Sequence, residues 1–173
     1  WNNRDKLANT VNQTLNNGIV QGISNNEMAR RLSKNMDSGF KVAKRLVDTE
    51  VTNSYNQATL AGYEASGVVD RYEYVATLDN RTSEICTSLD GLGPDDDGYP
   101  VDEAVTGLNY PPVHVNCRST TAAYFDTSKE GLTRIARGLD GKTFTVPAKM
   151  SAKDFRSIYV DKTITRAEWD KLN

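Results

Sequence analysis

The sequence predicts an α+β fold, in which an N-terminal helical arm packs on a small loop-rich lobe with a few short antiparallel strands. Three observations favour this class. Apolar residues recur at helical spacing in the first third of the chain, alternating β-branched segments appear only later, and residues 79–118 are rich in turn formers. We expect residues 1–68 to form the arm and residues 69–173 the lobe. Because the chain starts at Trp1 rather than Met, we expect both to belong to one continuous domain of a longer protein.

Composition sets the first limits on function. A chain of 173 residues buries roughly 70% of the surface that its unfolded state exposes, so it can form a hydrophobic core without disulfides or metal ions. No long apolar run predicts a membrane span. The net charge of −2 lacks the strongly basic footprint of a nucleic-acid-binding chain. One His and two Cys exclude a four-Cys zinc ribbon, and also a Ser-His-Asp triad with a separate His-rich metal site.

Three helices are predicted in the arm. Gly18 is expected to cap the first, Gly39 separates the second from the third, and Gly67 ends the third. Ser24 and Glu27 have the spacing of a capping box at the start of the second helix. The apolar faces are Leu7, Val11 and Leu15 in the first helix, Met28, Ala29, Leu32 and Met36 in the second, and Ala43, Leu46, Val47, Val51, Ala58, Ala61 and Ala65 in the third.

The lobe is predicted to hold short strands and two short helices. Alternating, aromatic and β-branched stretches predict strands over residues 71–78, 120–125 and 142–146, the last ended by Pro147. Residues 128–135 are helical or loose. Ser151 and Thr165 are expected to cap the two helices near the C-terminus, since an acidic residue follows each cap by three positions.

The irregular stretch 79–118 holds Cys86, His114 and Cys117, the only His and Cys of the chain. A loop of this length is usually functional or disordered. His114 and Cys117 form an H-x-x-C pair, which can place two ligands on one metal ion, with Cys86 as a third and Asp79, Asp90 or water as a fourth. Two other interpretations remain open. The thiols can form a disulfide worth about 3 kcal/mol, or be buried as small hydrophobic groups while His114 donates to a loop carbonyl.

Arg81, Thr82, Asn116 and Arg118 lie beside these residues in the sequence. In a loop-rich core such side chains usually satisfy buried backbone groups, and Arg118 with Asp79 would make a natural buried ion pair. The functional alternative is that the two arginines bind an anion or a phosphate group.

Two charged clusters have a simple and a functional interpretation. The run Asp95 to Asp97 before Gly98 lacks the ligand spacing of a calcium loop, so we expect a solvated turn. The cations near the helix junction form either a basic patch or a solvated face. They are Lys34, Lys41, Lys44 and Arg45.

The compound pattern D-x-R-T-x-x-x-C, L-D-G and P-P-x-H-x-N-C-R resembles the phage Mu F-like family of minor head proteins, also called the phage head morphogenesis domain. The residues that carry the resemblance are Asp79, Arg81, Thr82, Cys86, Leu89, Asp90, Gly91, Pro111, Pro112, His114, Asn116, Cys117 and Arg118. The long helix with Thr49 and Glu50 also fits the family. Residues 141–147 are similar to minor capsid proteins from phages of Gram-positive hosts, and the resemblance covers roughly residues 20–160.

The chain departs from the family pattern at three positions. Asp48 stands where the family often has Arg, Ser119 where it often has a last Cys, and Cys86 where relatives often have His. An exchange of Cys for His would keep a metal ligand but would destroy a disulfide. The resemblance therefore favours a structural zinc site over a disulfide.

The resemblance implies a minor capsid protein of a tailed bacteriophage, with a structural role in head assembly or DNA delivery. Its expected partners are the portal and other capsid proteins, with double-stranded DNA as a further candidate, and its expected location is the virion interior, with the host cytoplasm during assembly. We expect no enzyme activity. The alternative is a zinc-dependent hydrolase or nuclease, or a phage-carried effector, that uses the Cys86, His114 and Cys117 cluster. In that hydrolase Asp79 or Glu50 would be the base, and Arg118 would contact the phosphate.

Overall fold

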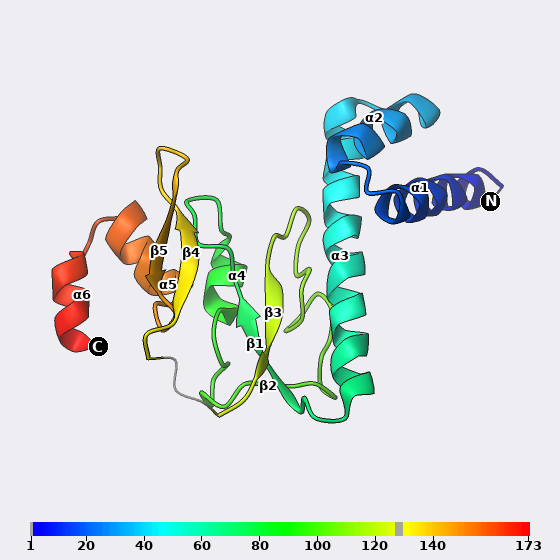
Figure 1. The fold of residues 1–173 in the computed structure, drawn as a ribbon. Coiled ribbons are helices and arrows are strands. Elements are labelled where there is room, and N and C mark those ends of the chain that lie inside the picture. The colour runs from blue at the N-terminus through cyan, green and yellow to red at the C-terminus, as the bar shows by residue number, and fades with distance from the viewer. Residues whose placement is uncertain (1, 127–129) are drawn as a thin grey trace.

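The computed structural model describes residues 2–126 and 130–173, and it confirms the α+β class (Figure 1). Three helices come first, short antiparallel strands follow, and small helices close the chain. The elements are α1 (Asn2–Val20), α2 (Asn25–Asn35), α3 (Phe40–Ser66), β1 (Arg71–Val75), α4 (Glu84–Leu89), β2 (Tyr99–Pro100), β3 (Thr120–Tyr124), β4 (Thr133–Arg137), β5 (Thr143–Pro147), α5 (Ala152–Phe155), the π-helix η1 (Arg156–Val160) and α6 (Arg166–Leu172).

The three N-terminal helices share one apolar core. Its fully buried members are Leu15, Met28, Ala29, Leu32, Ala43, Val47 and Val51. The predicted apolar face of the second helix is thus confirmed, and that of the third is confirmed at Ala43, Val47 and Val51. It was wrong at Ala58, Ala61 and Ala65, which are exposed because the second half of α3 turns Leu60 and Tyr63 toward the core around Tyr72 instead. Gly67 ends α3 in the left-handed conformation with φ of 63°. Leu7 was predicted to belong to the apolar face of the first helix, and its side chain is not among those that the structure describes.

One predicted helix end was wrong, and one predicted capping box was confirmed in part. Gly18 does not cap the first helix, because α1 continues to Val20. A Cβ at Gly18 would lie 2.1 Å from the sulfur of Met28, so this glycine permits close packing of α1 on α2 instead. Ser24 caps α2 by accepting from the backbone N–H of Glu27. The reciprocal half of the predicted capping box is replaced, because the Glu27 carboxylate pairs with Arg31 at 3.0 Å.

The central sheet has the strand order β2-β1-β3, and both pairings are antiparallel. Tyr72 and Tyr74 point to the buried face of β1 and are fully buried. Figure 1 shows α3 along one side of this sheet, and the β4–β5 hairpin with α5 and α6 on the other side. The loops between β1 and β3 therefore lie between the arm and the hairpin.

The lobe differs from prediction in several places, one of which is the short strand β2 within the stretch predicted to be irregular. The first strand ends at Val75 rather than at residue 78, since the chain then turns into the motif loop. A helix, α4, lies inside the stretch that was predicted to be irregular, where Ser83 caps it by accepting from the backbone N–H of Cys86. Residues 128–135 were predicted to be helical or loose, but the described part includes the strand β4, whereas residues 127–129 lie outside the described residues.

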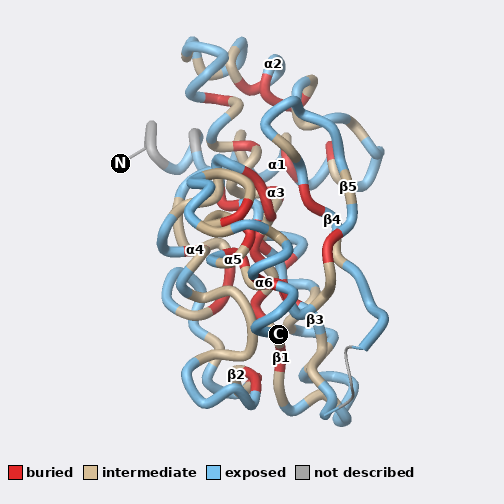
Figure 2. The backbone as a smooth tube through the Cα atoms, turned by 90° about the vertical axis from the view of Figure 1, so that its left-hand side faces the viewer, coloured by how far each residue is buried: buried red, intermediate tan, exposed pale blue. Residues whose placement is uncertain are grey.

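Two further cores stabilise the lobe. Tyr72, Val101 and Tyr110 pack against residues of α3, and the two tyrosine rings meet edge to face at 5.2 Å. The larger core joins β1, α4, the hairpin and the C-terminal helices; it comprises Tyr74, Ala76, Leu78, Cys86, Cys117, Ala136, Val146, Met150, Ala152, Phe155, Ile158 and Trp169. Figure 2 shows the buried segments where the elements face one another. Among the described residues, no helix has the length and apolar character needed to cross a membrane.

Candidate functional site

The two halves of the sequence motif meet against α4. Ser83 fixes the start of α4, so Cys86 lies in its first turn and faces the core. The second half turns back on itself, because the backbone N–H of Cys117 donates to His114 O at 3.1 Å and Asn116 has a φ of 59°. This turn carries His114 and Cys117 to the same side of the loop, toward Cys86.

Cys86, His114 and Cys117 form one cluster, with their potential ligand atoms all within 4.8 Å of one another. The Cys86 sulfur lies 3.2 Å from His114 Nε2 and 3.7 Å from the Cys117 sulfur. Both cysteines are buried and free, at 2% and 1% exposure. The donor set of two thiols and one imidazole can hold a metal ion.

Hydrogen bonds orient the cluster. His114 Nδ1 lies 2.8 Å from Val115 O, which assigns the proton to Nδ1 and leaves Nε2 with its lone pair toward the sulfurs. The Ser83 hydroxyl lies 2.8 Å from the same Nε2. The two sulfurs lie within hydrogen-bonding distance of each other. This contact lowers the pKa of Cys117 and, together with burial, raises the pKa of Cys86.

Asp79 and Arg118 join the first and second halves of the motif. Arg118 donates two N–H groups to the carboxylate, with Nη2 2.9 Å from Oδ1, in the two-pronged geometry that suits an arginine. The Asp79 side chain is 2% exposed and also accepts from the backbone N–H of Arg81 at 2.9 Å. Thr82 places its hydroxyl 3.2 Å from Asp79 Oδ1 and donates to Thr77 O. Asp79 is therefore engaged by arginines and is not part of the described group of three ligand residues.

This engagement controls the charge of Asp79. Burial alone would raise the pKa of the carboxyl, but hydrogen bonds from Arg118 and from the backbone of Arg81, with the charge of Arg118, outweigh it. The pKa of Asp79 is consequently well below its usual range. The same hydrogen bond raises the pKa of Arg118, so the pair is ionised.

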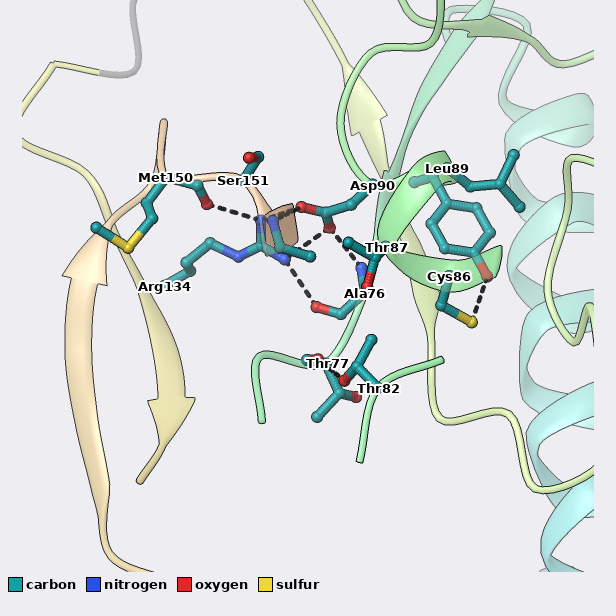
Figure 3. A network of polar contacts seen from close by, with 12 residues as sticks. Ala76, Thr77, Thr82, Cys86, Thr87, Leu89, Asp90, Arg134, Met150 and Ser151 are labelled. Atoms are coloured by element: carbon teal, nitrogen blue, oxygen red, sulfur yellow. Dashed lines mark hydrogen bonds and ion pairs between the residues drawn. The ribbon is translucent and has the colours of Figure 1, made fainter. Parts of the chain in front are cut away.

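Asp90 forms a second, separate ion pair, which holds the hairpin on the lobe (Figure 3). Its carboxylate is fully buried and accepts two N–H groups of Arg134, at 2.9 and 3.0 Å. It also accepts from the backbone of Ala76 and of Ala152, each at 2.7 Å. Gly91 follows with a φ of 106° and pairs with Tyr74 through two backbone hydrogen bonds. The L-D-G motif thus ends α4 and aims its carboxylate at three other elements.

The other predicted site residues lie around this frame. The backbone N–H of Asn116 donates to the Thr49 hydroxyl at 2.9 Å and so ties the second half of the motif to α3. Glu50 is half-buried on α3, where its carboxylate lies 3.5 Å from the Asn53 amide rather than at the cysteine cluster. Pro112 follows a cis peptide bond. The acidic run is a turn in which Asp97 pairs with Arg71 at 3.2 Å.

A cleft of about 680 Å³ separates the motif loop from α3. Its lining brings together two groups of cations that lie far apart in the sequence: Lys41, Lys44 and Arg45 from α3, and Arg81 and Arg118 from the motif. The one lining acid, Asp48, is engaged by Lys44 and by the amide of Asn25. Lys34 is not among the lining residues.

Sequence reasoning missed several partners. Two of them are Ser83, which contacts the imidazole, and Tyr74, whose hydroxyl lies 3.4 Å from the Cys86 sulfur. Their positions in a predicted loop and a predicted strand gave no sign of a contact with the cluster. Arg134 lay in a segment without clear periodicity. Asn56 is a buried amide on α3 that donates to Ser119 O at 3.2 Å. A polar residue on the buried face of a helix was the available signal for Asn56.

Comparison with known proteins gives two matches. Residues 9–122 match the family described as Phage Mu protein F like protein. The chain is also 29% identical over 136 residues to an NAD(+)--arginine ADP-ribosyltransferase, EFV, of Enterococcus faecalis. That match covers 71% of this chain but only 27% of the Enterococcus protein. No solved structure matches.

Proposed function

Because the chain belongs to the Phage Mu protein F like family, whose role is phage head morphogenesis, we propose that it is a minor capsid protein of a tailed phage. In this proposal it is a non-enzymatic part of the virion, located inside the head near the portal and in contact with the packaged DNA. During assembly it resides in the host cytoplasm. Its partners are the portal and other capsid proteins.

The observation that carries the structural role is the closure of the motif on itself. Asp79 from the first half and Arg118 from the second neutralise each other, and Asp90 is fully occupied by Arg134 and backbone groups. Groups that are saturated in this way rigidify a fold. They are poorly placed to exchange protons with a substrate.

The hydrolase alternative gains no support from this geometry. Its expected bases were Asp79, which is held ionised by Arg118, and Glu50, which does not line the cleft. The activity named for the Enterococcus protein is not carried over, because most of that protein lies outside the match. Incubation of the chain with DNA and zinc should leave the DNA intact.

Contact with DNA is supported by the cleft. It gathers five cations against one acid in a chain whose net charge is −2. Three of the cations are partly neutralised, since Lys44 pairs with Asp48, and Arg81 and Arg118 share Asp79. Lys41 and Arg45 are therefore the main candidates for contacts with DNA phosphates, which provide sequence-independent affinity.

Salt-dependent binding tests this contact. The double variant Lys41→Gln/Arg45→Gln should weaken binding to double-stranded DNA of any sequence. If it removes two phosphate contacts, the slope of log K against log salt should fall by about 1.8. The matched control is Arg30→Gln/Arg31→Gln, which removes equal charge from α2, away from the cleft lining. Equal losses in both double variants would contradict a phosphate-binding cleft.

Co-expression tests the protein partners. The tagged chain should retain the portal protein of its phage during purification, and it should do so after nuclease treatment. Failure to retain either the portal or the major capsid protein would contradict the proposed partners.

A further inference from the structure

We propose that Cys86, His114 and Cys117 bind one zinc ion, which clamps α4 to the second half of the motif. The inference goes beyond the proposed head function, which needs no metal. It rests on the positions of three side chains, two of them buried, that come from segments far apart in the sequence.

Two of the three separations in the cluster are close to those of a tetrahedral zinc site, and all three ligand atoms lie within 4.8 Å of one another. With Zn–S bonds of about 2.3 Å and Zn–N bonds of about 2.0–2.1 Å, two sulfurs on a tetrahedron lie about 3.8 Å apart, and a sulfur and a nitrogen about 3.5 Å apart. The corresponding separations are 3.7 Å between the sulfurs and 3.2 Å between Cys86 and His114. A disulfide would instead require the sulfurs to approach to about 2.05 Å.

The surroundings orient the ligands for a metal. His114 directs Nε2 at the sulfurs because its Nδ1–H is held by Val115 O, the arrangement that protein second shells commonly give a metal-binding imidazole. The Tyr74 hydroxyl lies 3.4 and 3.9 Å from the two sulfurs and can donate to a coordinating thiolate. Two thiolates and an imidazole select zinc over magnesium or calcium, which prefer oxygen ligands.

The fourth position is left to water. Asp79 is committed to Arg118, and the cleft that His114 and Cys117 help to line connects the cluster with solvent. Three protein ligands with one water are compatible with zinc, although structural sites more often have four. The clamp role follows from the connection: Cys86 lies on α4, whereas His114 and Cys117 precede β3.

Metal analysis of the purified chain is the direct test. After expression in medium with zinc, the chain should carry about one zinc per molecule. A chelator should remove the zinc and lower the melting temperature, and added zinc should restore it. Titration of the metal-free chain with cobalt(II) should produce the visible absorption of a tetrahedral site together with thiolate-to-metal charge transfer.

Variants separate ligands from neighbours. Cys86→Ser and Cys117→Ser should lose the zinc, whereas Tyr74→Phe, which removes a hydroxyl beside the same sulfurs, should keep it. Cys86→His should also retain metal, because an imidazole can coordinate zinc, although it cannot form a disulfide. If the serine variants fail to fold, the cobalt titration of the unmodified chain tests independently whether the cluster binds a metal ion.

Two outcomes would overturn the proposal. One is a metal-free chain after growth in zinc, with unchanged melting in chelator and no cobalt spectrum. The other is a Cys86–Cys117 disulfide, found by mass spectrometry of the non-reduced chain. Neither outcome bears on DNA binding or on association with the head.

Discussion

Replacing Arg134 by Met should loosen the β4–β5 hairpin from the rest of the lobe. The guanidinium donates two hydrogen bonds to Asp90 and others to the carbonyls of Ala76 and Met150, at 2.7 and 3.3 Å. Arg134 is 15% exposed and Asp90 fully buried, so the pair is shielded from water. Methionine fills much of the same volume but supplies none of these donors.

The magnitude follows from what remains. Removing one partner of a buried ion pair costs about 3–5 kcal/mol, because the other charge stays buried without compensation. Asp90 keeps two backbone donors, from Ala76 and Ala152, which places the expected loss at about 3–4 kcal/mol. In a chain of this length the melting temperature should fall by roughly 6–16 °C.

Urea unfolding provides the assay. The midpoint should fall while the slope stays constant, as expected for a change in stability alone. Arg137→Met is the matched control, since it removes an exposed arginine from the same strand and should change stability by less than about 0.5 kcal/mol. The double variant Arg134→Met/Asp90→Leu should lose less stability than the sum of the losses of the two single variants, by about 1–3 kcal/mol. A loss no larger than that of Arg137→Met, or strict additivity, would refute the role of this pair.

Three further changes test the arm and the motif. Because the pKa of Asp79 is depressed in the folded state, its ionised carboxylate stabilises the fold fully above the ordinary aspartate pKa near 3.9, and this stabilisation is lost as the pH falls below that value. Asp79→Asn should therefore flatten the acid limb of a stability–pH curve measured by urea unfolding. Gly18→Ala should lower the melting temperature, because a Cβ there meets Met28 and overpacking costs about 1–3 kcal/mol. The control Gly62→Ala, in open space on α3, should instead raise stability by about 1 kcal/mol. A gain in stability at both sites would contradict the close packing of α1 on α2. Asn56→Ala should cost about 1–3 kcal/mol in calorimetry, since it leaves a buried carbonyl before β3 without its donor, and a neutral result would contradict that tie.

Local signals predicted the helical arm well. The first half of α3 carries the predicted apolar period, the helix ends at a glycine in the left-handed conformation, and β1 shows alternation that its burial pattern confirms. Gly18 misled because its role is tertiary: a capping glycine and a close-packing glycine look alike until the neighbouring helix is placed. The six-residue helix α4 was missed since its apolar face is too short to show a period.

The site was predictable in its composition but not in its connections. The scarcity of His and Cys pointed to the cluster, and the carboxylate–guanidinium chemistry pointed to the Asp79–Arg118 pair, which the structure contains. The partnership of Asp90 with Arg134 spans 44 residues, and no local pattern encodes such a pairing. The cleft likewise arises only when α3 and the motif loop are brought together.

The most direct test of the head function is the protein content of purified phage heads. Phage particles carrying the encoding gene should contain the chain, protected from added protease while the capsid is intact, and particles made without the gene should show a defect in assembly or DNA delivery. Absence of the chain from mature heads and from assembly intermediates, with normal particles in its absence, would contradict the account.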